Sequence, residues 1–189
     1  MKNTNGKSFL KTISSEYPNS ISIELLQYAL LFMFGVLATT LHAYLRVPLG
    51  IPGHNGLIFM AVMVFGRSFI NKPMSGLVSC LGASTVLYLN VIGMKDPYIY
   101  FPYLAMGVVF DLLGIIYVSE KWRFLLVGIV AGVAFTCIPF FRYIVQSAGI
   151  YAYGSLLKHG LAVTVISHFA FAFGGGVLGY FTNKKINKD

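Results

Sequence analysis

Runs of apolar residues long enough to cross a lipid bilayer follow one another through nearly the whole chain. A helix of about 20 apolar residues spans the hydrocarbon core of a membrane. Helices also satisfy their own backbone hydrogen bonds, which lipid cannot do. A hydrophobic fraction of 57%, only 11% charged residues and a mean hydropathy of +0.74 agree with this pattern. The sequence therefore predicts an all-α integral membrane protein, a bundle of about six transmembrane helices.

The apolar runs divide the chain into three predicted regions. Residues 1–20 form a polar, basic cytoplasmic tail, residues 21–183 the six-helix transmembrane domain, and residues 184–189 a second basic cytoplasmic tail. We expect the first helix to remain in the mature protein, because no small-residue cleavage site follows its apolar run. The six spans are predicted at residues 22–45, 55–70, 74–94, 100–118, 124–141 and 160–181.

The basic residues predict the orientation of the bundle. Formal net charge is +8, and the basic residues lie at the ends of apolar runs, which argues for a topology signal and against nucleic-acid binding. With six spans and both termini cytoplasmic, ten of the fourteen basic residues fall inside and four outside, as the positive-inside rule requires. The inner set is Lys2, Lys7, Lys11, Arg67, Lys72, Lys121, Arg123, Lys184, Lys185 and Lys188, and the outer set is Arg46, Lys95, Arg142 and Lys158.

The segment between the first two spans, residues 46–56, has an unusual composition. It holds two prolines, three glycines, an arginine, a histidine and an asparagine, which neither a helix nor a lipid-facing surface favours. Prolines make such a segment rigid, and glycines let its backbone approach other groups closely. One interpretation is a lid whose polar groups line a pocket. The other is a tight turn between helices with an interfacial arginine.

Several polar residues fall in the predicted outer half of the bundle. They comprise arginines, histidines and asparagines that could hold an anionic or strongly hydrogen-bonding small molecule. Our candidates for substrate binding are Arg46, His54, Asn55, His42, Asn90, Arg142 and His168. A single histidine in a helix is also commonly an ordinary hydrogen-bonding residue, and His168 alone fits that description.

Two further features lie inside the predicted spans. Gly35, Thr39 and Ala43 form a strip of small residues on one face of the first span, where a separate coupling subunit could pack closely. The alternative for this strip is ordinary packing within the chain. Asp111 is an acidic residue well inside an apolar run, where an unpaired carboxylate would be costly, so it is either functional or bonded to a neighbouring helix.

No catalytic motif accompanies these residues. The chain has no HExxH, GxSxG or P-loop sequence and no carboxylate pair, so we expect no enzymatic activity and no hydrolysis of ATP by this chain. Cys80 and Cys137 lie in apolar runs without a CxxC spacing, which favours packing roles over a metal site or a disulfide. We predict no metal and no cofactor.

Part of the sequence resembles a known family of membrane proteins. The features are a chain of about six spans, the strip on the first span, and the segment Ala43-Tyr44-Leu45-Arg46-Val47-Pro48-Leu49 leading to Pro52 and a second span ending at Gly66-Arg67. Together they look like the substrate-binding S components of energy-coupling factor (ECF) vitamin transporters. Arg46-Val47-Pro48-Leu49 is distantly similar to the biotin S component, whereas Gly50 to Gly56 departs from that component's proline-rich, Thr-Gln-containing continuation.

The resemblance implies a function and a location. The chain would capture a vitamin-like micronutrient outside a bacterial-type cell membrane, as a multi-pass subunit in the lipid bilayer. A separate transmembrane coupling subunit and cytosolic ATPase subunits would drive uptake. Two other classes of function stay open from the residues: a membrane redox protein in which His42 and His168, or another pair of histidines, ligate a haem, and a structural or assembly protein with no small ligand.

Overall fold

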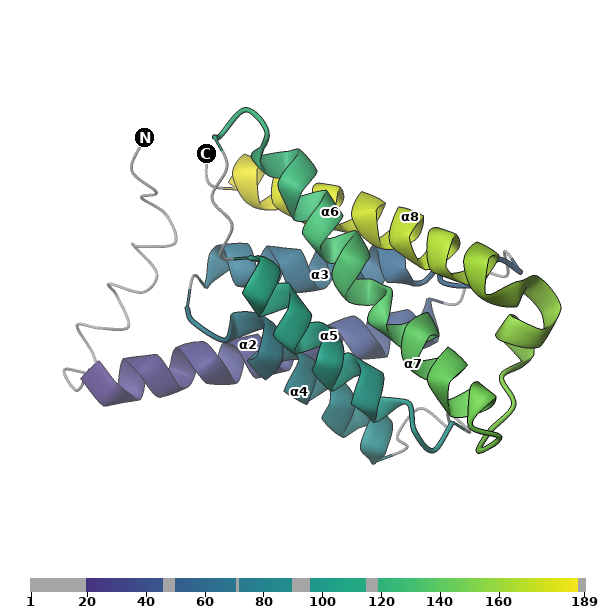
Figure 1. Cartoon of the computed structure of the whole chain (residues 1–189). Coiled ribbons are helices and arrows are strands. Elements are labelled where there is room, and N and C mark those ends of the chain that lie inside the picture. The colour runs from purple at the N-terminus through teal and green to yellow at the C-terminus, as the bar shows by residue number, and fades with distance from the viewer. Residues whose placement is uncertain (1–19, 46–49, 71, 90–95, 115–118, 187–189) are drawn as a thin grey trace.

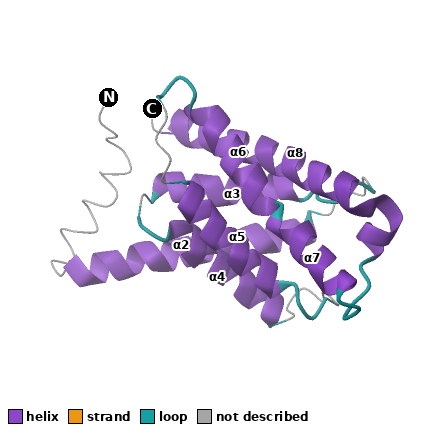
Figure 2. Cartoon of the chain, in the orientation of Figure 1, coloured by secondary structure: helices purple, strands orange, loops and turns teal. Residues whose placement is uncertain are grey.

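The computed structural model describes residues 20–45, 50–70, 72–89, 96–114 and 119–186, and these residues form helices and no strand (Figure 2). The all-α prediction is confirmed for this part of the chain. The helices are α2 (Ser20–Tyr44), α3 (Gly56–Phe69), α4 (Ser75–Tyr88), α5 (Tyr100–Leu113), α6 (Arg123–Phe135), α7 (Cys137–Ser147) and α8 (Gly154–Ile186).

Among the described residues, three helical segments are long and apolar enough to cross a membrane. They are Ile23–Tyr44 in α2, Arg123–Ser147 across α6 and α7, and Gly154–Ile186 in α8. The helices α3, α4 and α5 are apolar but have 14 residues each, or about 21 Å of helix, against a hydrocarbon core of about 30 Å. The structure therefore indicates a membrane protein, and six complete spans remain a prediction.

The helices run back and forth between two ends of one bundle (Figure 1). The helix α2 packs on α4, α4 packs on α5, and α8 packs on both α3 and α6. The start of α2 and the end of α8 lie at the same end of the bundle. We call the other end, where α2 ends and α3 begins, the pocket end. The side of the membrane that each end faces remains a prediction.

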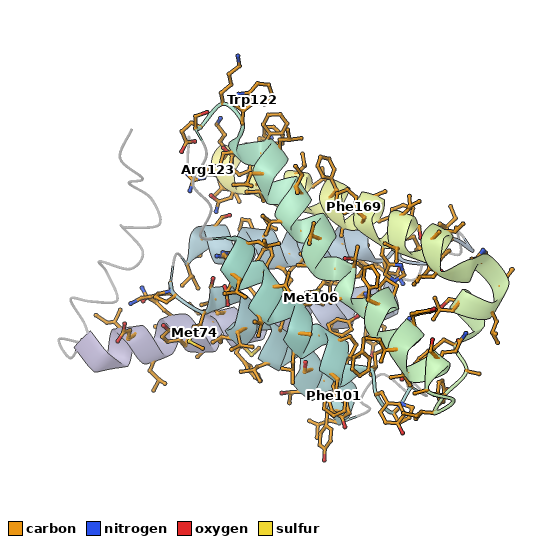
Figure 3. All side chains as sticks on the ribbon, in the orientation of Figure 1. Met74, Phe101, Met106, Trp122, Arg123 and Phe169 are labelled. Carbon is orange, nitrogen blue, oxygen red and sulfur yellow. The ribbon has the colours of Figure 1, made fainter. Side chains whose placement is uncertain are left out.

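Glycines bring the helix backbones into direct contact. A Cβ atom at Gly35 of α2 would overlap the carbonyl oxygen of Ser79 in α4, and one at Gly82 of α4 would overlap Phe32 of α2. On α8, Gly175 and Gly179 lie in the same way against the backbone of α3. Because lipid provides no hydrophobic drive between helices, such close approach is a principal source of their association. The core between these contacts is aromatic and methionine-rich, with Met106 near its middle (Figure 3).

The predicted coupling strip is part of this packing. Gly35 is buried, Thr39 is 1% exposed and Ala43 is 8% exposed. All three residues therefore lie inside the chain, with α4 covering Gly35. This burial favours the internal-packing alternative, and the coupling role of the strip stays a prediction.

Candidate ligand pocket

A cavity of about 210 Å³ lies at the pocket end of the bundle. Five of the seven predicted substrate-binding residues line it, and they come from α2, the 50–55 segment, α7 and α8. They are His42, His54, Asn55, Arg142 and His168. The other two, Arg46 and Asn90, lie outside the described residues. The remaining lining residues are Ile51, Pro52, Gly53, Ile99, Tyr103, Phe135, Ile138 and Ser155.

The Pro52–Gly53 turn lies directly against α8. A Cβ atom at Gly53 would be 2.6 Å from His168 Nδ1, and the backbone there has a φ of +79°. Both the space and the torsion therefore require glycine. This turn positions residues 51–55 in the wall of the cavity, and the lid interpretation of residues 46–56 stays a prediction.

The two histidines beside this turn donate hydrogen bonds to backbone carbonyls. His54 Nδ1 lies 2.6 Å from the carbonyl oxygen of Ile51, and His168 Nδ1 lies 2.7 Å from that of Thr164. The His168 ring also stacks on Phe135, with 5.5 Å between ring centroids. Both imidazoles are thus held in fixed orientations. His42, in the last turn of α2, contacts Phe59 edge to face.

Arg142 is less available to a ligand than its sequence position indicates. Its guanidinium pairs with Asp96 at 3.3 Å and lies over the Tyr153 ring, 5.2 Å from the centroid. The Tyr153 hydroxyl donates to Asp96 at 3.2 Å. Burial and the Asp96 carboxylate raise the pKa of Tyr153 to about 12, so the phenol stays protonated. The positive charge of Arg142 in the pocket is therefore compensated by Asp96. Its Nε atom is buried, and none of the described residues forms a hydrogen bond with it.

Sequence reasoning missed the aromatic and acidic members of this site. Phe135 and Tyr103 line the cavity, and Phe59 packs between them with centroid distances of 5.9 and 5.2 Å. In an apolar run such rings are indistinguishable from core residues. Asp96 lies among tyrosines and prolines whose composition indicates an interfacial belt. Its charge, opposite in sign to Arg142, was the available signal.

Comparison with protein-family models, curated proteins and solved structures gives no match for this chain. The described residues also contain no group of three or more His, Cys, Asp or Glu side chains placed to hold a metal ion. The site is therefore interpreted from its own geometry.

A second polar cluster lies away from the cavity and explains Asp111. The two carboxylate oxygens of Asp111 accept hydrogen bonds from the backbone N–H groups of Gly76 and Leu77, each at 2.8 Å. Arg67 pairs with the same carboxylate at 3.3 Å and donates to the carbonyl of Phe110 at 2.7 Å. Asp111 thus caps α4 from α5, where the helix dipole favours a negative charge. The residue connects α3, α4 and α5, and it lines no part of the pocket.

Proposed function

We propose that this chain is the substrate-binding subunit of a micronutrient uptake transporter, similar to the S components of ECF transporters. It binds its solute in the cavity at the pocket end and relies on separate coupling and ATPase subunits. The solute enters from the extracytoplasmic side of the cell membrane.

One observation carries this proposal. Five polar residues from four separate segments of the chain line a single cavity, and each belongs to the set that the sequence indicated for a solute. Ligand sites are commonly apolar clefts with a few convergent polar groups, which is the composition found here. Because the pocket residues come from α2, the 50–55 segment, α7 and α8, binding depends on the whole bundle.

The direct test is to identify what the protein holds. We expect gentle purification in detergent, followed by heat release and mass spectrometry, to yield one small metabolite in near-stoichiometric amount. The same compound, radiolabelled, is expected to accumulate only in cells that also contain a coupling subunit and ATPases. Accumulation by this chain alone, or absence of any released compound that also rebinds, would contradict the proposal.

Replacing Arg142 with alanine is expected to weaken binding of that compound by about ten- to a hundredfold, because a charge-assisted hydrogen bond contributes about 1.5–3 kcal/mol. Isothermal titration in detergent measures the affinity, and thermal unfolding without ligand measures the fold. Asp96→Asn is the matched variant, since it removes the ion pair but keeps the guanidinium. If Asp96→Asn weakens binding as much as Arg142→Ala, Arg142 acts by supporting the fold and does not touch the solute.

A further inference from the structure

We propose that the cavity takes a small planar ring compound that donates a hydrogen bond, from N–H or O–H, to Nε2 of His168, with Nε2 of His54 as a second acceptor. This inference rests on the proposed function and specifies the chemical class of its solute.

The proton positions follow from the backbone partners. A carbonyl oxygen can only accept, so the proton of each hydrogen bond belongs to Nδ1 of His54 and of His168. In a neutral imidazole the other nitrogen is then an acceptor. Among the described residues neither ring pairs with a carboxylate. His168 is 5% exposed, and burying an ionised ring without such a partner would be costly, which favours the neutral form.

The packing around His168 determines which edge of its ring can meet a ligand. Thr164 and Gly53 cover the Nδ1 edge, and Phe135 covers one face. The Nε2 edge is the part of the ring that remains for a ligand, and no described residue forms a hydrogen bond with Nε2. His54 also lines the cavity, and its Nε2 is buried without a hydrogen-bond partner in the described part of the chain. An unsatisfied buried acceptor such as Nε2 of His54 favours a ligand that supplies the donor.

The size and walls of the cavity indicate a flat ligand. A volume of about 210 Å³ is below the range of about 300–1,000 Å³ usual for pockets of drug-sized molecules. Phe135 and Tyr103 line this cavity with the edges of packed aromatic rings, which a flat ring can meet edge to face. A compact aromatic heterocycle or phenol with one or two donors can form hydrogen bonds with the histidine acceptors and contact the aromatic walls of the cavity.

Two isosteric probes separate donor recognition from simple apolar binding. Indole carries one N–H donor, and benzofuran has the same shape with an oxygen at that position. Both probes are titrated against the purified full chain in detergent, and binding is measured by saturation-transfer NMR. The Ser155→Trp variant, designed to fill the cavity with its indole ring, gives the background signal of binding outside the cavity. We expect indole to bind about three- to tenfold more tightly than benzofuran, the range of one neutral hydrogen bond.

Two substitutions then assign the acceptor. The amide of His168→Gln lies near the position of Nε2, whereas that of His168→Asn lies near Nδ1. We expect His168→Gln to keep the preference for indole and His168→Asn to abolish it. If His168→Asn keeps the preference, His168 is not the acceptor.

The wild-type result distinguishes failure of this inference from failure of the proposed function. Equal affinity for indole and benzofuran, above the Ser155→Trp background, would overturn donor recognition and leave a binding pocket in place. No binding of either probe above that background would overturn the pocket, and the proposed function with it. Because this contrast needs no His168 variant, it decides the question even if such a variant fails to fold.

Discussion

Replacing Gly35 with leucine is expected to prevent accumulation of folded protein, or to lower the free energy of unfolding by about 3 kcal/mol or more. Overpacking a core costs about 1–3 kcal/mol where side chains can adjust. Here the obstacle is backbone, because a Cβ at Gly35 would overlap the Ser79 carbonyl and lie 3.0 Å from the Ala83 nitrogen. Fluorescence-detected size-exclusion chromatography and thermal unfolding in detergent measure the effect.

Ala29→Leu is the matched control, because Ala29 lies exposed on the same helix. It introduces the same leucine side chain at a position that the described residues leave exposed, so we expect yield and melting temperature close to those of the unmodified protein. If Gly35→Leu behaves like Ala29→Leu, the close approach of α2 and α4 is wrong, and the strip is free to meet another subunit.

The second large effect is expected at Asp111. Asp111→Asn should lower the free energy of unfolding by about 3 kcal/mol, because removing one partner of a partly buried ion pair leaves Arg67 uncompensated. An asparagine also has a single acceptor oxygen for the two N–H groups that Asp111 now satisfies. Chemical denaturation in detergent measures the change, and ligand affinity should be retained in the folded fraction.

The Glu120–Arg123 pair provides the comparison. Its side chains are 73% and 54% exposed, against 18% for Asp111 and 24% for Arg67. Glu120→Gln should therefore cost less than about 1 kcal/mol, as is usual for surface pairs. Similar small losses for both variants would mean that the Asp111 cluster is solvated and does not connect its three helices.

The apolar runs predicted where helices lie better than where they end. Helix α7 continues to Ser147, beyond the predicted end of the fifth span, because Pro139 lies in its first turn, where a missing N–H costs nothing. Helix α8 begins at Gly154, before the predicted start, although Gly160 departs from helical torsions at that start. Hydropathy does not register such local backbone geometry.

The sequence predicted which residues line the pocket better than it predicted their contacts. Arginine, histidine and asparagine are rare in apolar runs, so their position along the predicted spans assigned five lining residues to one end of the bundle. Which groups they bond to depends on packing between segments distant in sequence, as in the contact of Gly53 with His168. The same limit applies to the strip, because spacing identifies a close-packing face but not the helix that covers it.

Gly160 has a left-handed φ of +73°, which interrupts α8 between two residues that line the cavity. Ser155 precedes this residue and His168 follows it. The two lining residues therefore belong to separate helical parts of α8, on either side of Gly160. The longer part, after Gly160, packs on α3 through Gly175 and Gly179. The two sides of the cavity that carry Ser155 and His168 are therefore not one continuous helix, although both belong to α8.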